Sequence, residues 1–193
     1  MLGKFKLILK NKFDKKNMIK TCYFGGGCFW CTEAIFKKIN GVISIFPGYM
    51  GGHVKNPSYE QVCEGYTGHA EIIKIDYDSS KILFEDLLSV FFSTHDPTTL
   101  NRQGNDIGTQ YRSSIFTSDD KEVEILKNYI EELGKTFDKK IVTTIEDLSE
   151  FYLAEDYHHN YYNLNKKVPY CSVVIGPKIK KLLNSKNSFL KDD

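Results

Sequence analysis

Two thiols able to do chemistry, Cys28 and Cys31, lie in the stretch GGGCFWC, residues 25–31. The thiolate is the nucleophilic form of cysteine, and a helix N-terminus stabilises it through unpaired backbone N–H groups. Apolar residues recur at helical spacing from Cys31 onward, so Cys28 is expected at the start of a helix. The glycines permit a sharp turn that keeps the thiol uncovered. We interpret Cys28 as a reactive nucleophile; the alternative is a buried cysteine beside a packing turn.

Cys31 has two interpretations. It lies one helical turn after Cys28, so the two sulfur atoms can approach each other. It also continues the apolar stripe of Ala34, Ile35 and Ile39, which is typical of core packing. Redox exchange and packing both remain open for this residue.

Phe29 and Trp30, between the two cysteines, are bulky aromatics that suit a pocket for an apolar, polarisable group. A CxxC pair after a strand is also typical of thioredoxin-like proteins, but this chain is longer than such a module needs. A zinc site is not supported, because there is one CxxC pair and His158 and His159 are adjacent rather than at ligand spacing. We expect no bound metal.

A carboxyl group is the second candidate for chemistry. The segment HAEIIKIDY, residues 69–77, alternates apolar and polar residues as a strand does, and Glu71 has the same parity as Ile73 and Ile75. Its carboxyl is therefore expected at the end of the apolar face of that strand. Partial desolvation there raises the pKa and keeps the group protonated near neutrality. The alternative is a solvated glutamate at a strand end.

The elements that must position these groups alternate between strands and helices. Strands are predicted at 21–24, 42–46, 69–77, 113–116 and 141–145, and helices from Cys28 onward and at 84–92 and 119–133. The polar, aperiodic segment 98–110 is predicted to be a functional loop. This pattern indicates an α/β (α+β) protein, a two-layer sandwich built on a mixed β-sheet.

Composition indicates one globular domain in a reducing compartment. The chain has 193 residues, of which 41% are hydrophobic, and no apolar run approaches the ~18 residues needed to span a bilayer. Its five cysteines are odd in number and scattered, unlike a disulfide scaffold. We therefore expect a cytoplasmic protein in which Cys22 and Cys63 are structural.

Positive charge is concentrated at the two ends of the chain. Residues 1–20 hold seven lysines against one aspartate, and residues 178–193 hold five lysines against two aspartates. The body between them is acidic, which argues against a nucleic-acid groove. We expect a basic N-terminal extension at 1–20, with disorder or a targeting role as options, a catalytic domain at 21–177, and a basic, solvated tail at 178–193.

Several motifs together resemble the A class of peptide methionine sulfoxide reductases. They occur in family order over roughly residues 20–180: GGGCFW, GYMGG, NPSY, TGHAE, HDPTTLNRQGNDIGTQYRS and AEDYHHNYY. The resemblance implies a ferredoxin-like core with long active-site loops. It also implies reduction of the S epimer of methionine sulfoxide, free or in proteins.

The resemblance assigns roles to individual residues. Cys28 is the implied nucleophile, Phe29 and Trp30 form the pocket for the ε-methyl group, and the sulfoxide oxygen is bound or protonated by Glu71, Tyr59 and Tyr111. Asp106 matches a position that helps to order the site. These roles agree with the chemistry, because a sulfoxide oxygen leaves only after protonation.

Attack by Cys28 yields a sulfenic acid, which a second thiol condenses with to form a disulfide. In the best-known family pattern a glycine stands at position 31, and a glycine-rich tail carries two cysteines. Here the tail VPYCSVVIGPKIKKLL holds only Cys171, which does not support a two-step relay through the tail. Cys171, by the family pattern, and Cys31, by proximity, are both candidates for the resolving thiol, and we favour Cys171 because one helical turn does not place Cys31 ideally for a disulfide.

Thioredoxin or another dithiol is the expected reductant, with no bound cofactor. Oxidised proteins or free methionine sulfoxide are the expected substrates, with no nucleic acid or membrane partner, and the chain is expected to be a monomer. Two other functions fit parts of the pattern. One is a thiol–disulfide oxidoreductase using Cys28 and Cys31, and the other is a non-catalytic binder of methionine-rich segments.

Overall fold

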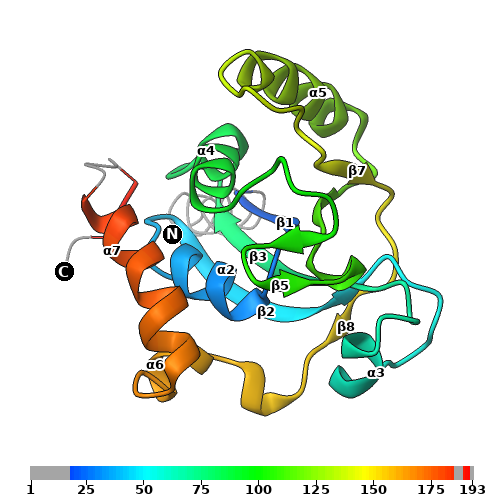
Figure 1. Cartoon of the computed structure of the whole chain (residues 1–193). Helices are drawn as coiled ribbons and strands as arrows, with labels where there is room; N and C mark the ends of the chain where they lie inside the picture. Colours follow the sequence, from blue (N-terminus) through cyan, green and yellow to red (C-terminus); the bar gives the residue numbers. More distant parts are fainter. Residues whose placement is uncertain (1–17, 185–188, 192–193) are drawn as a thin grey trace, which may run out of the picture.

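A six-stranded mixed sheet organises the part of the chain that the computed structural model describes, residues 18–184 and 189–191. The strand order is β7-β6-β1-β3-β2-β8 (Figure 1). Every neighbouring pair is antiparallel except β6 and β7, which are parallel. The strands are β1 (Ile19–Gly26), β2 (Val42–Met50), β3 (Ala70–Asp78), β6 (Ser113–Phe116), β7 (Thr144–Glu146) and β8 (Tyr152–Leu153).

The centre of the sheet has the expected ferredoxin-like topology. Helix α2 (Phe29–Phe36) connects β1 to β2, and helix α4 (Phe84–Thr94) connects β3 toward β6. The chain order β-α-β-β-α-β with the spatial order β6-β1-β3-β2 is that of a split βαβ unit. Both helices pack on one face, because the ring of Phe24 in β1 contacts rings of both. The predicted two-layer sandwich is confirmed.

The apolar alternation seen in the sequence lines the core. Ile73, Ile75 and Tyr77 of β3 are fully buried against the helices, together with Phe24 and Cys22 of β1. The opposite face of the sheet holds a smaller cluster of Met50, Ala70, Ile72 and Phe116. The same strands therefore present two apolar faces, which is why β3 is buried along nearly its whole length.

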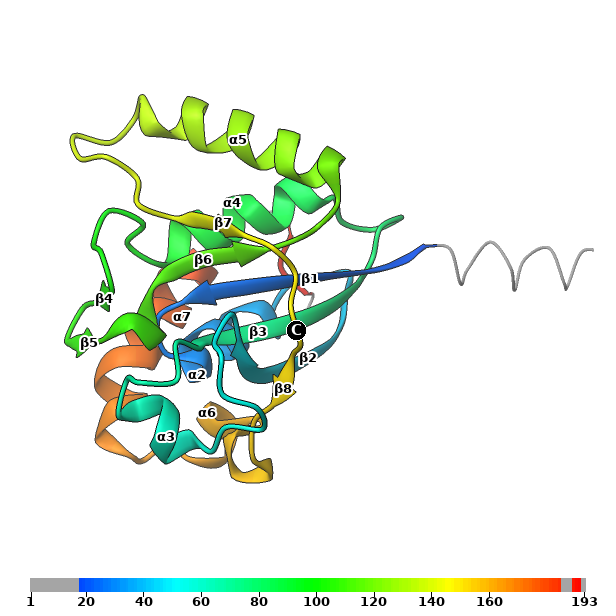
Figure 2. The same cartoon turned by 90° about the vertical axis from the view of Figure 1, so that its right-hand side faces the viewer.

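The remaining elements decorate the ends of the sheet, and α5 and α3 lie at opposite ends of the molecule (Figures 1 and 2). Asp119 caps α5 by accepting from the N–H groups of Lys121 and Glu122. The elements outside the six-stranded sheet and helices α2 and α4 are α3 (Tyr59–Cys63), the hairpin β4 (Arg102–Gln103) and β5 (Asp106–Ile107), the 3₁₀ turns η1 (Thr109–Tyr111) and η2 (Asp156–His158), α5 (Asp120–Gly134), α6 (Tyr161–Leu164), the π-helical turn η3 (Cys171–Ile175) and α7 (Gly176–Asn184).

Three predicted segments differ in the structure. Strand β2 continues past Phe46 through Pro47 to Met50, because its remaining residues pair with β3. Strand β7 begins at Thr144 rather than at 141, since the chain before it bonds the loop at Pro97 instead of β6. The polar segment 98–110 is not aperiodic loop throughout: it forms the β4–β5 hairpin and most of η1.

The basic C-terminal segment is not a solvated tail from residue 178. It forms most of α7, in which Ile179 and Leu182 are buried and pack beside α2. Further on, the N–H of Asn40 donates to the carbonyl of Phe189. The apolar residues of an amphipathic helix thus outweigh the charge that suggested a tail.

At the other end, residues 1–17 lie outside the described part of the chain, and β1 already begins at Ile19. The helices that the structure describes include none with both the length and the apolar character that a bilayer crossing needs.

Candidate active site

The turn between β1 and α2 places Cys28 at the N-terminus of the helix, as predicted. Cys28 is the N-cap residue of α2, and its carbonyl accepts from the N–H of Cys31. Gly27 has a φ of +89°, and the side chain of Gln103 from β4 packs against it so closely that a Cβ would clash. Only glycine meets both requirements, which explains the glycine directly before the thiol.

The Cys28 thiol is not an uncovered thiolate, which corrects the expectation drawn from the glycines. Only 7% of the residue is exposed. Burial raises the pKa of Cys28 well above its ordinary value, and its hydrogen bond to Cys31 and the charge of Glu71 raise it further. Removal from water outweighs the helix N-terminus here.

Cys31 is the more acidic of the two thiols. Its pKa is lowered to about 7, first by the hydrogen bond with Cys28 and then, against the effect of burial, by the charge of Lys178 and by Tyr170. Cys31 is therefore both packed in the core and chemically coupled to Cys28, so the two interpretations left open by the sequence are not exclusive. The two thiols therefore influence each other's titration.

Glu71 is the acid of the site. It is 1% exposed at the start of β3, and its Oε2 accepts from the backbone N–H of Phe29 at 3.0 Å. Burial raises the pKa of Glu71 to about 8, despite that bond, and the charges of Asp106 and Cys31 add to the effect. The carboxyl is buried, as expected from its position in β3, and the direction of its pKa shift agrees with the expected role as an acid.

Two tyrosines surround the same carboxyl. Tyr59 begins α3 and Tyr111 ends η1, and both are half-buried. The pKa of each is raised, first by burial and then by the charge of Glu71. Both hydroxyls therefore keep their protons, and that of Tyr59 is hydrogen-bonded to Cys63.

Asp106 lies in the β4–β5 hairpin on the other side of the thiols. Its Oδ2 accepts from the hydroxyl of Tyr170 at 2.7 Å, and the oxygen of Tyr170 lies 3.8 Å from Sγ of Cys31. The sequence analysis did not select Tyr170. The one feature that could have pointed to it is its position directly before Cys171.

An aromatic wall flanks the thiols. Trp30 is half-buried, stacks on Tyr161 with ring centroids 3.7 Å apart, and donates from Nε1 to Nδ1 of His158 at 2.9 Å. Burial lowers the pKa of His158 to about 4, so its neutral ring is the acceptor. Phe29 is 0% exposed and lies beneath this wall rather than on its open side, in contact with Tyr59.

Two supporting groups were also missed as individual residues, although both belong to the stretch AEDYHHNYY. One is His158, and the other is Glu155, whose carboxylate accepts from the Tyr49 hydroxyl at 2.8 Å and from the Tyr59 N–H at 2.8 Å. Glu155 therefore fixes the start of α3 and with it the position of Tyr59.

The other cysteines occupy different environments. Cys171 is 0% exposed in η3 and close enough to Cys31 for that thiol to affect its pKa, which burial raises first. Cys22 is buried in β1, in agreement with a structural role, whereas Cys63 is exposed at the end of α3. None of the five forms a disulfide in this structure.

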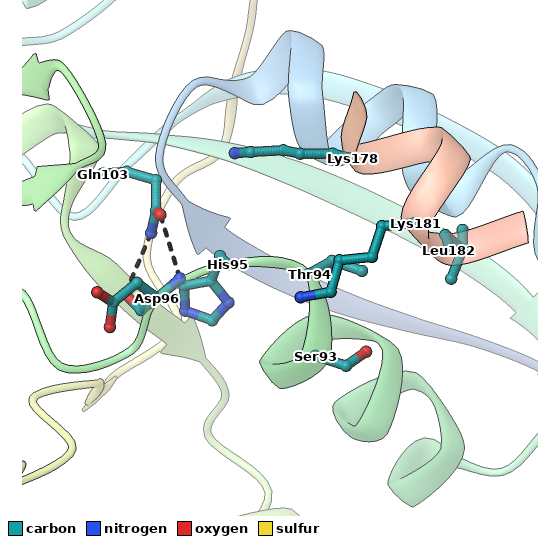
Figure 3. Close-up of a pocket in the computed structure, with 8 residues that line it drawn as sticks. All are labelled: Ser93, Thr94, His95, Asp96, Gln103, Lys178, Lys181 and Leu182. Atoms are coloured by element: carbon teal, nitrogen blue, oxygen red, sulfur yellow. Dashed lines mark hydrogen bonds between the residues drawn. The ribbon is translucent and has the colours of Figure 1, made fainter. Parts of the chain in front are cut away.

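Two hollows, each of about 350 Å³, are lined by Gln103, which packs against the glycine before Cys28, and by Lys178. One opens between the β4–β5 hairpin and η3 and includes Asp106 and Tyr170. The other lies between α4 and α7; in Figure 3, Gln103 is bonded to the backbone of Asp96 there. Its lining comprises Ser93, Thr94, His95, Asp96, Gln103, Lys178, Lys181 and Leu182. Within residues 18–184 and 189–191 no group of three or more metal-ligating side chains converges.

A thiol pair at a helix N-terminus, facing a buried protonated carboxyl, defines a cysteine-dependent oxidoreductase. The sequence model of the family described as peptide methionine sulfoxide reductase matches residues 20–190. Peptide methionine sulfoxide reductase MsrA of Saccharolobus solfataricus is 55% identical over 159 residues, which cover 82% of this chain and 90% of the relative.

Solved structures agree with this match. Mxr1 from Saccharomyces cerevisiae in reduced form has a TM-score of 0.73 at 35% identity and covers 78% of this chain and 88% of its own. Mxr1 in complex with Trx2 has a TM-score of 0.52 at 25% identity and covers 75% and 86%. The chain belongs to the peptide methionine sulfoxide reductase family, and it is an enzyme that reduces methionine sulfoxide.

Proposed function

We propose that the site reduces the S epimer of methionine sulfoxide, free or in proteins, by attack of Cys28 on the sulfoxide sulfur while Glu71 protonates the oxygen. One observation carries this assignment: the buried carboxyl of Glu71, with a pKa of about 8, bonds the residue next to Cys28. An acid that is protonated at neutral pH beside a nucleophilic sulfur is what sulfoxide reduction requires.

The tyrosines complete the oxygen site. Tyr59 and Tyr111 keep their hydroxyl protons and lie near Glu71, so they donate to the sulfoxide oxygen and bind it more strongly as negative charge develops. Asp106 orders the opposite side through Tyr170. The ε-methyl group lies against Trp30, which is partly exposed, and Phe29 supports this pocket from beneath.

The proton of Cys28 moves to Cys31 during the attack. In the resting pair Cys31 is the more acidic thiol and accepts a hydrogen bond from Cys28, so it is a base already in contact with the nucleophile. The negative charge thus shifts onto Cys28 only as the sulfur–sulfur bond forms. The sulfur–sulfur bond then breaks as the protonated oxygen passes from the substrate sulfur to Cys28. Methionine leaves, Cys28 is a sulfenic acid, Glu71 is a carboxylate and Cys31 is a neutral thiol.

Cys31 is the proposed resolving thiol. It is hydrogen-bonded to Cys28, whereas Cys171 is coupled to Cys31 and is fully buried in η3. The family pattern alone favours Cys171, which becomes the second candidate. Condensation of the Cys31 thiol with the Cys28 sulfenic acid gives a disulfide and water.

Thioredoxin is the proposed reductant of that disulfide. Support comes from the yeast relative Mxr1, which is described in complex with Trx2. Exchange with a dithiol needs no cofactor, because both electrons come from the partner's thiols. We further propose a monomeric, cytoplasmic enzyme without nucleic-acid or membrane partners, with a catalytic domain from about residue 21 and a basic N-terminal extension before it.

Epimer selectivity tests the function. Purified enzyme with dithiothreitol is expected to convert the S epimer of a methionine sulfoxide peptide and to leave the R epimer unchanged, because one chirality alone places the methyl group at Trp30 and the oxygen at Glu71. Chiral chromatography of the residual sulfoxide measures both reactions. Equal consumption of the two epimers would contradict the proposed geometry.

Disulfide mapping tests the resolving thiol. After one turnover without reductant, mass mapping is expected to find Cys28 linked to Cys31. Cys31→Ser is expected to form the first methionine more slowly, because it lacks the Cys31 base, and then to stop with Cys28 as a sulfenic acid, whereas Cys171→Ser still forms the disulfide. A Cys28–Cys171 link in the wild-type enzyme would instead assign resolution to Cys171.

A further inference from the structure

Tyr170 connects Cys31 to Asp106 through a single hydroxyl. It donates to Oδ2 of Asp106 at 2.7 Å, while its oxygen lies 3.8 Å from Sγ of Cys31. A phenol has one proton to donate and lone pairs with which to accept. Either atom of the Tyr170–Cys31 contact can be the donor, so with the phenolic proton given to Asp106 the Tyr170 oxygen is able to accept from Cys31 once Cys31 is a protonated thiol. Beside the Cys31 thiolate the same hydroxyl lowers the pKa of Cys31. The contact is therefore suited to take a proton from a Cys31 thiol.

Such a proton acceptor is needed at one step of the reaction. Cys31 receives the proton of Cys28 in the first step and must lose it again before it can attack the sulfenic acid. The largest effect that lowers the pKa of Cys31 is its bond with the Cys28 thiol, and that S–H no longer exists once Cys28 carries oxygen. Without that bond, burial raises the pKa of Cys31, and the thiol holds its proton more tightly.

We propose that Tyr170 is a catalytic residue of disulfide formation, which passes the proton of Cys31 to Asp106. This rests on the proposed role of Cys31 as resolving thiol. The S–H bond of Cys31 breaks as its proton moves to the Tyr170 oxygen, and the phenolic proton moves to Asp106. The Cys31–Cys28 bond forms, the bond from Cys28 to oxygen breaks, and hydroxide leaves as water with a proton from solvent. Asp106 returns its proton to solvent.

The surroundings of Tyr170 fit this role. Its pKa is raised strongly, first by burial and then by the charges of Cys28 and Cys31, which makes a phenolate unfavourable. A relay in which Tyr170 accepts one proton while it donates another never forms that phenolate. Its ring meets Trp30 edge to face, with centroids 5.8 Å apart, which fixes the hydroxyl. The hollow between the β4–β5 hairpin and η3 is lined by Asp106 and Tyr170 and gives the proton an exit.

Tyr170→Phe tests the relay, because it keeps the ring against Trp30 and removes only the hydroxyl. In a single turnover without reductant the first methionine is expected to form. Conversion of the Cys28 sulfenic acid to the disulfide is expected to slow by about tenfold to 100-fold near neutral pH. Intact-mass analysis of acid-quenched samples follows both species over time. Asp106→Asn, which still accepts from Tyr170 but cannot take a proton, is expected to slow the same step.

The pH profile separates a relay from a structural role. Without Tyr170, Cys31 loses its proton directly to water or hydroxide, so disulfide formation in Tyr170→Phe is expected to accelerate with pH and approach the wild-type rate by about pH 9. A merely distorted site would stay slow at every pH. The groups that influence or adjoin Cys31 in this range are Cys28, Glu71, Asp106, Tyr170, Cys171 and Lys178.

Tyr129→Phe is the matched control, since this half-buried tyrosine of α5 stacks on Phe92 outside the site and its loss of a hydroxyl should change neither step. Wild-type rates of disulfide formation in both Tyr170→Phe and Asp106→Asn would overturn the relay. So would loss of the first methionine in Tyr170→Phe. A Cys28–Cys171 link in the wild-type mapping experiment contradicts the role of Cys31 itself, and that result is obtained before any Tyr170 variant is made.

Discussion

Cys28→Ser is expected to abolish reduction of methionine sulfoxide, with a loss of at least about 10⁴-fold in the rate of methionine formation. A serine hydroxyl is far less acidic than a thiol, and Cys31, with a pKa of about 7, is too weak a base to remove its proton. A serine side chain also cannot take up the sulfoxide oxygen, whereas the cysteine sulfur does so and becomes a sulfenic acid. A peptide assay with excess dithiothreitol measures the loss, since that reductant makes the resolving thiol dispensable.

The matched comparison is alanine at two buried cysteines. Cys28→Ala is expected to be inactive, and Cys22→Ala is expected to retain wild-type activity, because Cys22 is buried in β1 and the charges that influence it, Glu122 and Asp76, lie outside the site. If Cys31 rather than Cys28 were the nucleophile, the alanine variants would give a different result. If Cys31→Ala lost the first methionine while Cys28→Ala kept it, the lower pKa of Cys31 would mark the nucleophile itself.

Glu71→Gln is expected to slow methionine formation by about 10²- to 10⁴-fold while the protein stays folded. The amide has the same shape, and its oxygen still accepts from the N–H of Phe29, but it has no proton that it can transfer. Stopped single-turnover measurement of methionine isolates this step from disulfide reduction. Glu122→Gln is the control, since Glu122 also has a pKa raised by burial but lies on α5 and bonds Thr117.

The pH profile of the same step carries a second signature of Glu71. Burial raises its pKa to about 8, so the acid is protonated below that pH and is lost above it. The wild-type rate is therefore expected to fall as pH rises through about 8, and this descending limb should be absent in Glu71→Gln. On the acid side the rate is expected to rise through about 7, where Cys31 loses its proton. An unchanged descending limb in the variant would assign it to another group.

Local pattern was enough to predict the skeleton of the fold. The glycine turn before Cys28, the alternation of β3 and the helix predicted at 119–133 each follow from short-range rules, and the structure agrees with all three. Where tertiary contacts decide, prediction failed. Pro47 sits in a strand because β3 supplies the pairing, and α7 is a packed helix although its lysines suggested a tail.

The features of the candidate site also divide into those that local sequence pattern predicts and those that tertiary contacts decide. Parity along β3 predicted the burial of Glu71, since alternation fixes which face a side chain occupies. The charge state of Cys28 was not predictable, because it depends on a bond to Cys31 and on elements far away in the sequence. Tyr170 stands 139 positions after Cys31 in the sequence, and no local rule predicts that these two side chains meet.

The depth of the thiol pair affects how the enzyme survives the conditions in which its substrate accumulates. Bulk peroxide oxidises cysteines that are exposed and charged, and the endpoint beyond sulfenic acid is irreversible. Here 7% of Cys28 and 2% of Cys31 face solvent, and the more acidic thiol is the less exposed of the two. We therefore expect peroxide to over-oxidise this catalyst of oxidative repair more slowly than it would an exposed thiolate.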